Sequence, residues 1–296
     1  MLRPVIIMMA LTVAAAWTPV RAVSTQAEVA ESPTLSRIAR SGVVNVGYIP
    51  TPGTFAFRNR NGETVGYSID LCQRVIANIR RSLNRPDLLV MFRAVEPVQR
   101  IPLLKAGEID IECGGNTNTI ARQKEVDFSH TFFHTGVRFL VRKPFTVETP
   151  ASLWHRKVAV TKGTTAQDVV FKLKSEQGLE PVVVDSDAQG VRLVETGLVN
   201  AFAQDDVLLY GLVANSTLKA ELAVSGSFLT VEPYAFMLPK GDAAFRNIVD
   251  STMLSLMRSG EVVTIYNKWF DNERMRIPMN VYMKENLRFP SRYGIH

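Results

Sequence analysis

The chain is predicted to be an α/β protein of two lobes, each built on a mainly parallel sheet with helices on both faces. Apolar runs of strand type alternate with helical runs over residues 43–113, and the same alternation starts again after residue 156. Two further apolar runs, at 137–142 and 234–238, stand between the two series and suit a hinge of two crossing strands. The roughly 270 residues after the first 22 are also at the size where one core tends to divide into two.

The first series begins with a short helix over residues 34–41 and a buried strand over 43–47. After a stretch rich in proline and glycine, residues 59–63 are predicted as a hairpin turn. Asp70 is predicted as the N-cap of the next helix, because apolar residues recur at helical spacing over residues 71–83.

The first series ends in the most informative turn of the chain. A strand over residues 88–92 and a short helix over 101–107 lead to a strand over 109–113, and Gly114 and Gly115 follow directly. Two glycines allow the backbone to turn sharply and to come close to a ligand.

Arg122 follows this turn in a short helical segment that small hydroxyl and amide residues introduce. Backbone amides exposed at such a turn favour an anion, and a guanidinium binds a carboxylate through two parallel hydrogen bonds. The pattern therefore indicates a site for a small carboxylate. An ordinary strand-to-helix turn with a solvated arginine is the alternative that these residues leave open.

The second series repeats the pattern. Its predicted elements are the strand 157–161, the turn 162–165, the helix 166–176, the strand 181–184, the helix 187–196, the strand 201–204 and the helix 206–213. Two later helices, 243–259 and 261–270, follow the return crossing and are predicted to complete the first lobe. The predicted division is therefore 33–142 with 233–296 for the first lobe and 143–232 for the second.

The predicted topology brings three turns to one cleft. Ligands of open α/β sheets bind beyond the carboxyl ends of the strands. The turn after Cys113 lies at this position in the first lobe, and the turns at 161–165 and 204–206 lie there in the second.

The N-terminal residues 1–22 are predicted to be a secretory signal peptide. Arg3 precedes an apolar run from Val5 to Trp17, and small residues lead to a cleavage site after Ala22. The run is shorter than the about 20 residues that a membrane span needs. An exported protein of a bacterial periplasm is therefore expected, with an uncleaved amphipathic anchor as the alternative.

Charge and composition exclude several classes of function. Removal of residues 1–22 takes away two arginines, so the net charge falls from +6 to +4, with 32 basic and 28 acidic side chains. The basic residues are dispersed, which argues against nucleic-acid binding, and a mild positive balance suits a small anionic ligand. No metal and no cofactor are expected, because the histidines lack partners at ligand spacing beyond the pair His130 and His134.

Two cysteines are too few for a disulfide scaffold. Cys72 is expected in the first turn of a helix and Cys113 at a strand end, near the same edge of a sheet. A disulfide between them and a pair of buried thiols both agree with this placement.

The order and spacing of several short motifs resemble the family-3 periplasmic solute-binding proteins of ABC importers, over about residues 35–288. Residues 65–70 are similar to the Gly-aromatic-Asp-x-Asp signature of that family, with Ser68 at the first Asp. Further motifs match its glutamate/aspartate-binding subgroup, namely Arg100–Gly107, Glu112–Gly114, Arg122–Lys124, Phe128–Ser129, Gly163–Thr165, Ala201–Phe202, Asp205–Asp206 and Lys268–Phe270. The resemblance implies the type II periplasmic-binding-protein fold.

The resemblance also implies an α-amino-acid site. Arg122 would pair with the α-carboxylate of the ligand, with hydrogen bonds added by Thr117 and the backbone amide of Thr165. Asp205 would receive the α-ammonium, helped by the backbone carbonyl of Gly115. For Asp205, the N-cap of the following helix is the alternative role.

The side-chain end of this site departs from the glutamate/aspartate pattern. The subgroup has an arginine where this chain has Ile49, a serine at Pro97, and a histidine near Ala188 or Gln189. Arg100 is retained, and in the subgroup it meets the distal carboxylate; a structural role at a helix start is the alternative. Glutamate, aspartate, a polar uncharged amino acid and a larger carboxylate all remain candidate ligands, since a second buried carboxylate with half its partners removed is costly.

The expected protein is a monomeric binding protein, not an enzyme, that closes two lobes on an amino acid and presents the closed form to a membrane permease. Two alternatives keep the same fold. A periplasmic cyclohexadienyl dehydratase would need a general acid, for which Glu112 and Glu96 are the candidates. A sensory module would present its closed state to a receptor.

Overall fold

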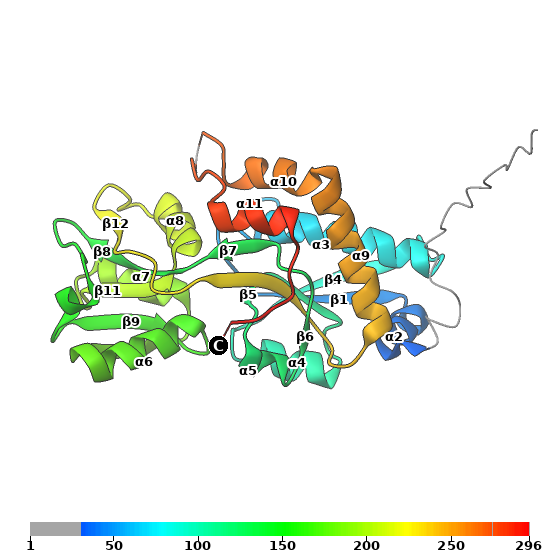
Figure 1. Cartoon of the computed structure of the whole chain (residues 1–296), viewed down its shortest axis with the longest axis horizontal. Helices are drawn as coiled ribbons and strands as arrows, with labels where there is room; N and C mark the ends of the chain where they lie inside the picture. The colour runs from blue at the N-terminus through cyan, green and yellow to red at the C-terminus, as the bar shows by residue number, and fades with distance from the viewer. Residues whose placement is uncertain (1–30, 274, 296) are drawn as a thin grey trace, which may run out of the picture.

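The computed structural model describes residues 31–273 and 275–295, and it confirms a mixed α/β protein of two lobes (Figure 1). The predicted signal peptide, residues 1–22, lies outside the described residues. Within the described part, no helix is both long and apolar enough to cross a membrane.

The first lobe has a six-stranded sheet in the order β4, β1, β5, β13 and β6, with β7 paired to β13. The bounds are β4 Leu89–Ala94, β1 Val43–Tyr48, β5 Ile111–Thr117, β13 Glu232–Leu238, β6 Asp127–Phe128 and β7 Phe133–Thr135. Strands β4, β1 and β5 are parallel, and the returning strand β13 joins them in antiparallel orientation. Between β1 and α3 in the sequence, β2 (Phe57–Arg58) and β3 (Thr64–Val65) form a separate antiparallel hairpin.

Helices cover both faces of this first sheet. Their bounds are α2 Pro33–Ser41, α3 Tyr67–Ser82, α4 Arg100–Ala106, α5 Ile120–Gln123, α9 Ala243–Ser259, α10 Glu261–Trp269 and α11 Val281–Arg288. The larger core joins α2, α3, α9 and α10 to one face, and a smaller cluster places Leu104 of α4 against Ala235 and Met237 on the other. As predicted, the two helices after the return crossing complete the first lobe (Figure 1).

The second lobe has a five-stranded sheet in the order β10, β9, β11, β8 and β12. Its elements are β8 Val137–Arg142, the 3-10 helix η1 Pro150–Leu153, β9 Lys157–Thr161, α6 Thr165–Gln177, β10 Glu180–Val184, α7 Asp187–Glu195, β11 Ala201–Asp205, α8 Asp206–Asn215 and β12 Leu222–Ser225. Successive side chains of β11 point to opposite faces of the sheet, so they join the two apolar clusters that lie on those faces. Ala201 and Ala203 face α6, while Phe202 packs with α7 and α8.

The chain crosses between the lobes next to Gly136, where the two connecting segments touch. The backbone N–H of Leu229 donates to the carbonyl of Val137 at 3.0 Å, and a Cβ added at Gly136 would lie 2.2 Å from the carbonyl oxygen of Thr230. Strand β8, predicted as a crossing strand within 33–142, pairs with β11 and β12 in the second sheet. The predicted lobe boundaries themselves remain a prediction.

Two local predictions need correction. Helix α3 begins at Tyr67 with Gly66 as its N-cap, so Asp70 lies inside the first turn. Gly66 permits this start because its φ is +142° and a Cβ there would overlap the carbonyl of Phe55. Asp70 instead accepts hydrogen bonds from Lys268 and the indole of Trp269, each at 2.7 Å, which ties α3 to α10.

The second correction concerns the two glycines after Cys113, which belong to strand β5 and form no turn. Glu112 pairs with Met237 of β13, and pairing resumes at Asn116 with Ala235 and at Thr117 with Tyr234. The glycines lie in the bulge between these pairs. The glycines are needed for close packing, because a Cβ at Gly115 would lie 2.5 Å from the ring of Tyr234. A bulge of this kind bends a strand and redirects its end, here toward the space between the lobes.

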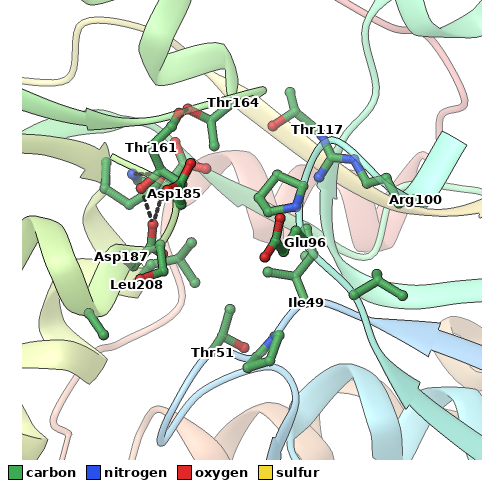
Figure 2. A pocket seen from close by; sticks show the side chains of 18 of the residues that line it. Ile49, Thr51, Glu96, Arg100, Thr117, Thr161, Thr164, Asp185, Asp187 and Leu208 are labelled. Carbon is green, nitrogen blue, oxygen red and sulfur yellow. Dashed lines mark hydrogen bonds between the residues drawn. The ribbon is translucent and has the colours of Figure 1, made fainter. Parts of the chain in front are cut away.

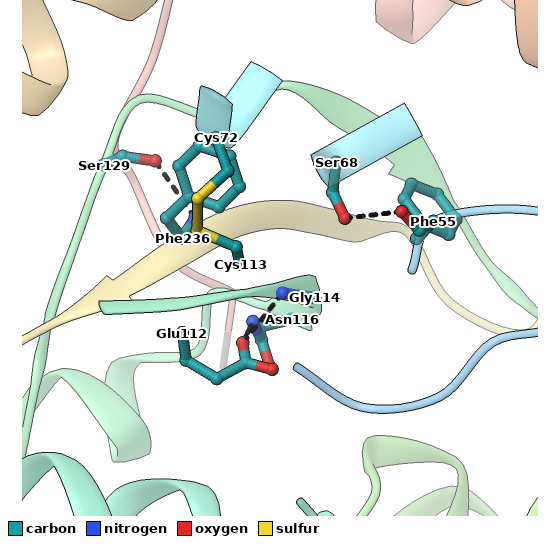
Figure 3. Close-up of a disulfide and its surroundings, with 9 residues drawn as sticks. All are labelled: Phe55, Ser68, Cys72, Glu112, Cys113, Gly114, Asn116, Ser129 and Phe236. Carbon is teal, nitrogen blue, oxygen red and sulfur yellow. Dashed lines mark hydrogen bonds between the residues drawn. A yellow bond between two sulfur atoms is a disulfide. The ribbon is translucent and has the colours of Figure 1, made fainter. Parts of the chain in front are cut away.

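Cys72 and Cys113 form a disulfide with Cα atoms 6.1 Å apart, which settles the open choice from the sequence (Figure 3). The bond links the buried face of α3 to β5 at the start of the bulge. The strand that carries the glycines is therefore held by both a covalent link and the sheet.

Candidate functional site

A cavity of about 400 Å³ lies between the two lobes, beyond the carboxyl ends of the central parallel strands. Residues from both lobes line it (Figure 2). All seven residues predicted for the ligand site are in this lining, namely Ile49, Arg100, Gly115, Thr117, Arg122, Thr165 and Asp205. Their location is thus observed, while their roles toward a ligand stay predictions.

Arg122 presents unused donors to the cavity. Its two Nη atoms donate to the carbonyl of Thr117 at 2.9 Å and to the carbonyl of Gly163, in the other lobe, at 3.3 Å. A guanidinium has five N–H groups, so these bonds leave capacity for a carboxylate. Burial lowers the pKa of Arg122, and the carboxylates of Glu232, Asp168 and Asp205 counteract this. No ion pair to Arg122 occurs within residues 31–273 and 275–295.

Arg100 is more deeply buried than Arg122, at 4 % exposure. Its Nη atoms donate to the side chain of Asn116 at 3.1 Å and to the carbonyl of Gly163 at 3.4 Å, while its Nε has no partner. Burial lowers its pKa to about 9, and the charge of Arg122 adds to this effect. Two guanidinium groups therefore converge on one carbonyl oxygen.

A buried glutamate compensates Arg100 from behind the cavity wall. Glu112 is fully buried and accepts hydrogen bonds from the side chain of Asn116 and from the backbone N–H of Gly114 (Figure 3). Burial raises the pKa of Glu112, and the charge of Arg100 opposes that rise. Glu112, Asn116 and Arg100 thus form one polar network inside the first lobe, and Glu112 is outside the cavity lining.

Asp205 faces the cavity from the end of β11. One carboxylate oxygen accepts a hydrogen bond from the hydroxyl of Tyr234, and the other, Oδ1, is buried without a partner. Burial raises the pKa of Asp205 well above its usual range, and the nearby carboxylate of Glu232 raises it further. Asp205 occupies the N-cap position of α8, yet its side chain makes no capping hydrogen bond, so its geometry favours the cavity over the alternative capping role.

Thr117 and Thr165 meet across the lobes. Their hydroxyl oxygens lie 3.5 Å apart, and the hydroxyl of Thr165 also lies 2.9 Å from the carboxylate of Glu232. Thr165 is the first residue of α6, whose N-cap is Thr164. Its backbone N–H therefore belongs to the free N-terminal amides of a 13-residue helix that begins at the cavity.

Several functional candidates were missed from the sequence. Tyr234 gave no local signal, because it is an ordinary aromatic residue of a predicted strand, yet its hydroxyl reaches Asp205 from the other lobe. Asp187 does stand after a strand at the start of a helix, which is a position that could have identified it. Its Oδ1 accepts hydrogen bonds from Thr161 at 2.6 Å and Gln204 at 2.8 Å, and burial raises its pKa.

The residues that depart from the glutamate/aspartate pattern lie in the lining too. Ile49, Pro97 and Ala188 all contribute to the cavity wall, while Gln189 does not. Among the described residues, no group of three or more His, Cys, Asp or Glu side chains is placed to hold a metal ion.

A two-lobed α/β protein whose cleft carries a guanidinium and an opposing carboxylate is organised to hold a small ligand. The chain belongs to the bacterial extracellular solute-binding proteins, family 3, whose profile matches residues 44–272. This confirms the family resemblance drawn from the motifs.

Characterised relatives cover most of the chain. It is 33 % identical over 267 residues to the L-glutamate/L-aspartate-binding protein of Pseudomonas aeruginosa, which spans 87 % of this chain and 88 % of the relative. It is 35 % identical over 241 residues to the glutamate/aspartate import solute-binding protein of Escherichia coli, covering 81 % and 80 % of the two chains.

Solved structures share the type II periplasmic-binding-protein fold. An ancestral arginine-binding protein bound to arginine is 27 % identical with a TM-score of 0.70, over 77 % of this chain and 98 % of that one. An ancestral amino acid-binding protein described as a precursor of cyclohexadienyl dehydratase is 27 % identical with a TM-score of 0.69, over 80 % and 99 %.

Proposed function

We propose that this protein binds a free α-amino acid in the cleft between its lobes and delivers it to the membrane permease of an ABC importer. The observation that carries the proposal is that Arg122 and Asp205 line one cavity of about 400 Å³. Arg122 keeps free N–H donors, and Asp205 keeps a buried oxygen without a partner. A zwitterion with one carboxylate and one ammonium satisfies both groups at once.

In this proposal Thr117 and the backbone amide of Thr165 assist Arg122, and the carbonyl of Gly115 assists Asp205. The relatives named above bind amino acids or import them, which supports the ligand class. The name of the Escherichia coli relative, an import solute-binding protein, supports delivery to a permease, and the family description supports a location outside the cytoplasmic membrane. Export through the predicted signal peptide and a monomeric state complete the proposal.

Titration calorimetry with the twenty amino acids tests the proposal on the mature protein. We expect at least one amino acid to bind with a micromolar or lower Kd. Arg122→Ala should weaken that binding at least about 30-fold, because truncating one partner of a buried charge pair costs about 2–5 kcal/mol. Arg258→Ala, a change in the last turn of α9 and outside the cavity, is the matched control and should leave binding unchanged. Absence of binding to all twenty amino acids would refute the proposal.

A dehydratase on the same fold is the second candidate, since one solved relative is described as a precursor of such an enzyme. Of the two acids considered from the sequence, Glu112 is sealed behind Asn116 and only Glu96 lines the cavity. Glu96 is exposed to solvent and is not held among the buried polar groups of the cavity wall. Incubation with prephenate or arogenate, followed by absorbance of the aromatic product, distinguishes this candidate, and we expect no turnover.

A further inference from the structure

The side-chain end of the cavity contains a carboxylate that is held in place and still open to a ligand. Asp187 begins α7, and two donors from its own lobe, Thr161 and Gln204, fix its Oδ1. Within residues 31–273 and 275–295, both hydrogen bonds to this carboxylate end on Oδ1 and none on Oδ2, and Asp187 lines the cavity. In Figure 2 its carboxylate lies on the second-lobe side, with Ile49 and Glu96 on the other side of the space.

The charges of the lining favour a cation there. Four carboxylates line the cavity, Glu96, Asp185, Asp187 and Asp205, against the two guanidinium groups of Arg100 and Arg122. An α-amino acid uses Arg122 and Asp205 for its own two charges. The remaining lining then holds three carboxylates and one guanidinium.

The charge of that one guanidinium is already balanced inside the first lobe by a buried carboxylate, and only its Nε lacks a partner. Arg100 donates to Asn116, whose amide donates in turn to the buried Glu112, and the charge of Glu112 stabilises the Arg100 cation. A ligand with a second carboxylate would place that group in the same space as Asp187. Asp187 is half-buried, so a like charge close to it is repelled, whereas an ammonium or guanidinium group is attracted.

The walls around Asp187 suit an aliphatic stem. Ile49 and Pro97 of the first lobe and Leu208 and Leu212 of α8 line the same cavity. A chain of methylene groups can pack on these side chains while its polar end reaches the carboxylate.

We propose that Asp187 receives a positively charged nitrogen at the end of the ligand side chain, so that the cleft selects a basic α-amino acid over an acidic one. The proposal rests on the proposed function, because it assigns the side chain of the same amino acid. It makes Asp187 a specificity-determining residue, whereas Arg122 and Asp205 hold the part common to all α-amino acids.

The test compares arginine, lysine, citrulline, glutamate and aspartate by calorimetry on the mature wild-type protein. Citrulline has nearly the shape of arginine without its charge, so this comparison needs no variant. We expect arginine or lysine to bind at least about 10-fold more tightly than glutamate, and arginine at least about 10-fold more tightly than citrulline, as loss of one charge-assisted hydrogen bond implies.

Asp187→Asn keeps an oxygen for Thr161 and Gln204 and removes the charge. It should weaken binding of the basic ligand roughly 10- to 100-fold and leave glutamate binding unchanged or stronger. Glu180→Gln removes the same charge from an exposed position of the second lobe outside the cavity, and it should leave every affinity unchanged.

The possible failures are distinguishable. Tightest binding of glutamate or aspartate, or equal affinity for arginine and citrulline, overturns the role of Asp187 while the amino-acid function stands. Equal weakening of all ligands by Asp187→Asn also overturns it, because that result shows a structural effect. Absence of binding to any amino acid overturns the proposed function and this inference together.

Discussion

Asp205→Asn should change ligand binding and stability in opposite directions. Asp205 is 4 % exposed, its Oδ1 has no partner, and burial with the neighbouring Glu232 raises its pKa. Ionisation of Asp205 therefore destabilises the unliganded protein, and the ligand is proposed to offset that cost. The asparagine keeps an acceptor for Tyr234 and removes the charge.

The direction of the stability effect follows from the pKa shift. Because the pKa of Asp205 is higher in the folded state, the unfolded chain loses this proton first as the pH rises. Between the unfolded and folded pKa values the unliganded protein loses about 1.4 kcal/mol of stability per pH unit, and above the folded value the loss is complete. The variant lacks this loss, so its unfolding temperature should exceed that of the wild type at neutral pH, by about 2–4 °C for each kcal/mol.

Binding should move the other way. Removal of the carboxylate that faces the α-ammonium should weaken amino-acid binding at least about 30-fold. Differential scanning calorimetry of the unliganded proteins and titration calorimetry with the ligand measure the two effects. A lower unfolding temperature for Asp205→Asn would refute the proposed destabilisation by the Asp205 charge, and undiminished binding would refute its role toward the ligand. Glu180→Gln is the control variant and should change neither the unfolding temperature nor the affinity.

The remaining predictions concern pH, a glycine and the disulfide. The α-ammonium of the ligand should lower the pKa of Asp205 on binding, so binding should release a proton at pH values below the unliganded pKa. Affinity should therefore rise with pH in that range, by up to about tenfold per pH unit. Equal binding enthalpies in phosphate and Tris buffers would contradict this proton release. Gly115→Ala should weaken ligand binding while the protein stays folded, because the added Cβ would lie 2.5 Å from the Tyr234 ring and force that ring to move. Titration calorimetry measures the binding, and near-ultraviolet circular dichroism checks that the protein is folded. Replacing Cys72 and Cys113 together by serine should reduce the free energy of unfolding by about 2–4 kcal/mol, measured by urea denaturation, with reductant having no further effect on the double variant.

Much of the fold was accessible from local patterns. The alternation of strand and helix, the order of the two series and the return of residues 243–270 to the first lobe were predicted from periodicity and connection rules. The residue at which helix α3 begins was predicted wrongly, because a contact with a distant part of the backbone decides it. Asp70 looked like a helix cap, but Gly66 can approach the carbonyl of Phe55, so the helix begins earlier.

The two glycines after Cys113 show a similar limit. A pair of glycines predicts a turn from sequence, yet here both lie in a strand because Tyr234 of β13 occupies the space where a side chain at Gly115 would be. Tyr234 lies on the returning strand β13, far from Gly115 along the chain. No local pattern contains that information.

The sequence by itself determined the class of fold, the family and the chemical types at the proposed site, because periodicity, motif order and residue identity are local properties. Only the tertiary structure decided which charges oppose each other across the cleft. The compensation of Arg100 by Glu112 through Asn116 and the open carboxylate of Asp187 both depend on burial and on hydrogen-bond partners. Such partners come from separate strands and lobes, so their positions are fixed when the sheets pack and not before.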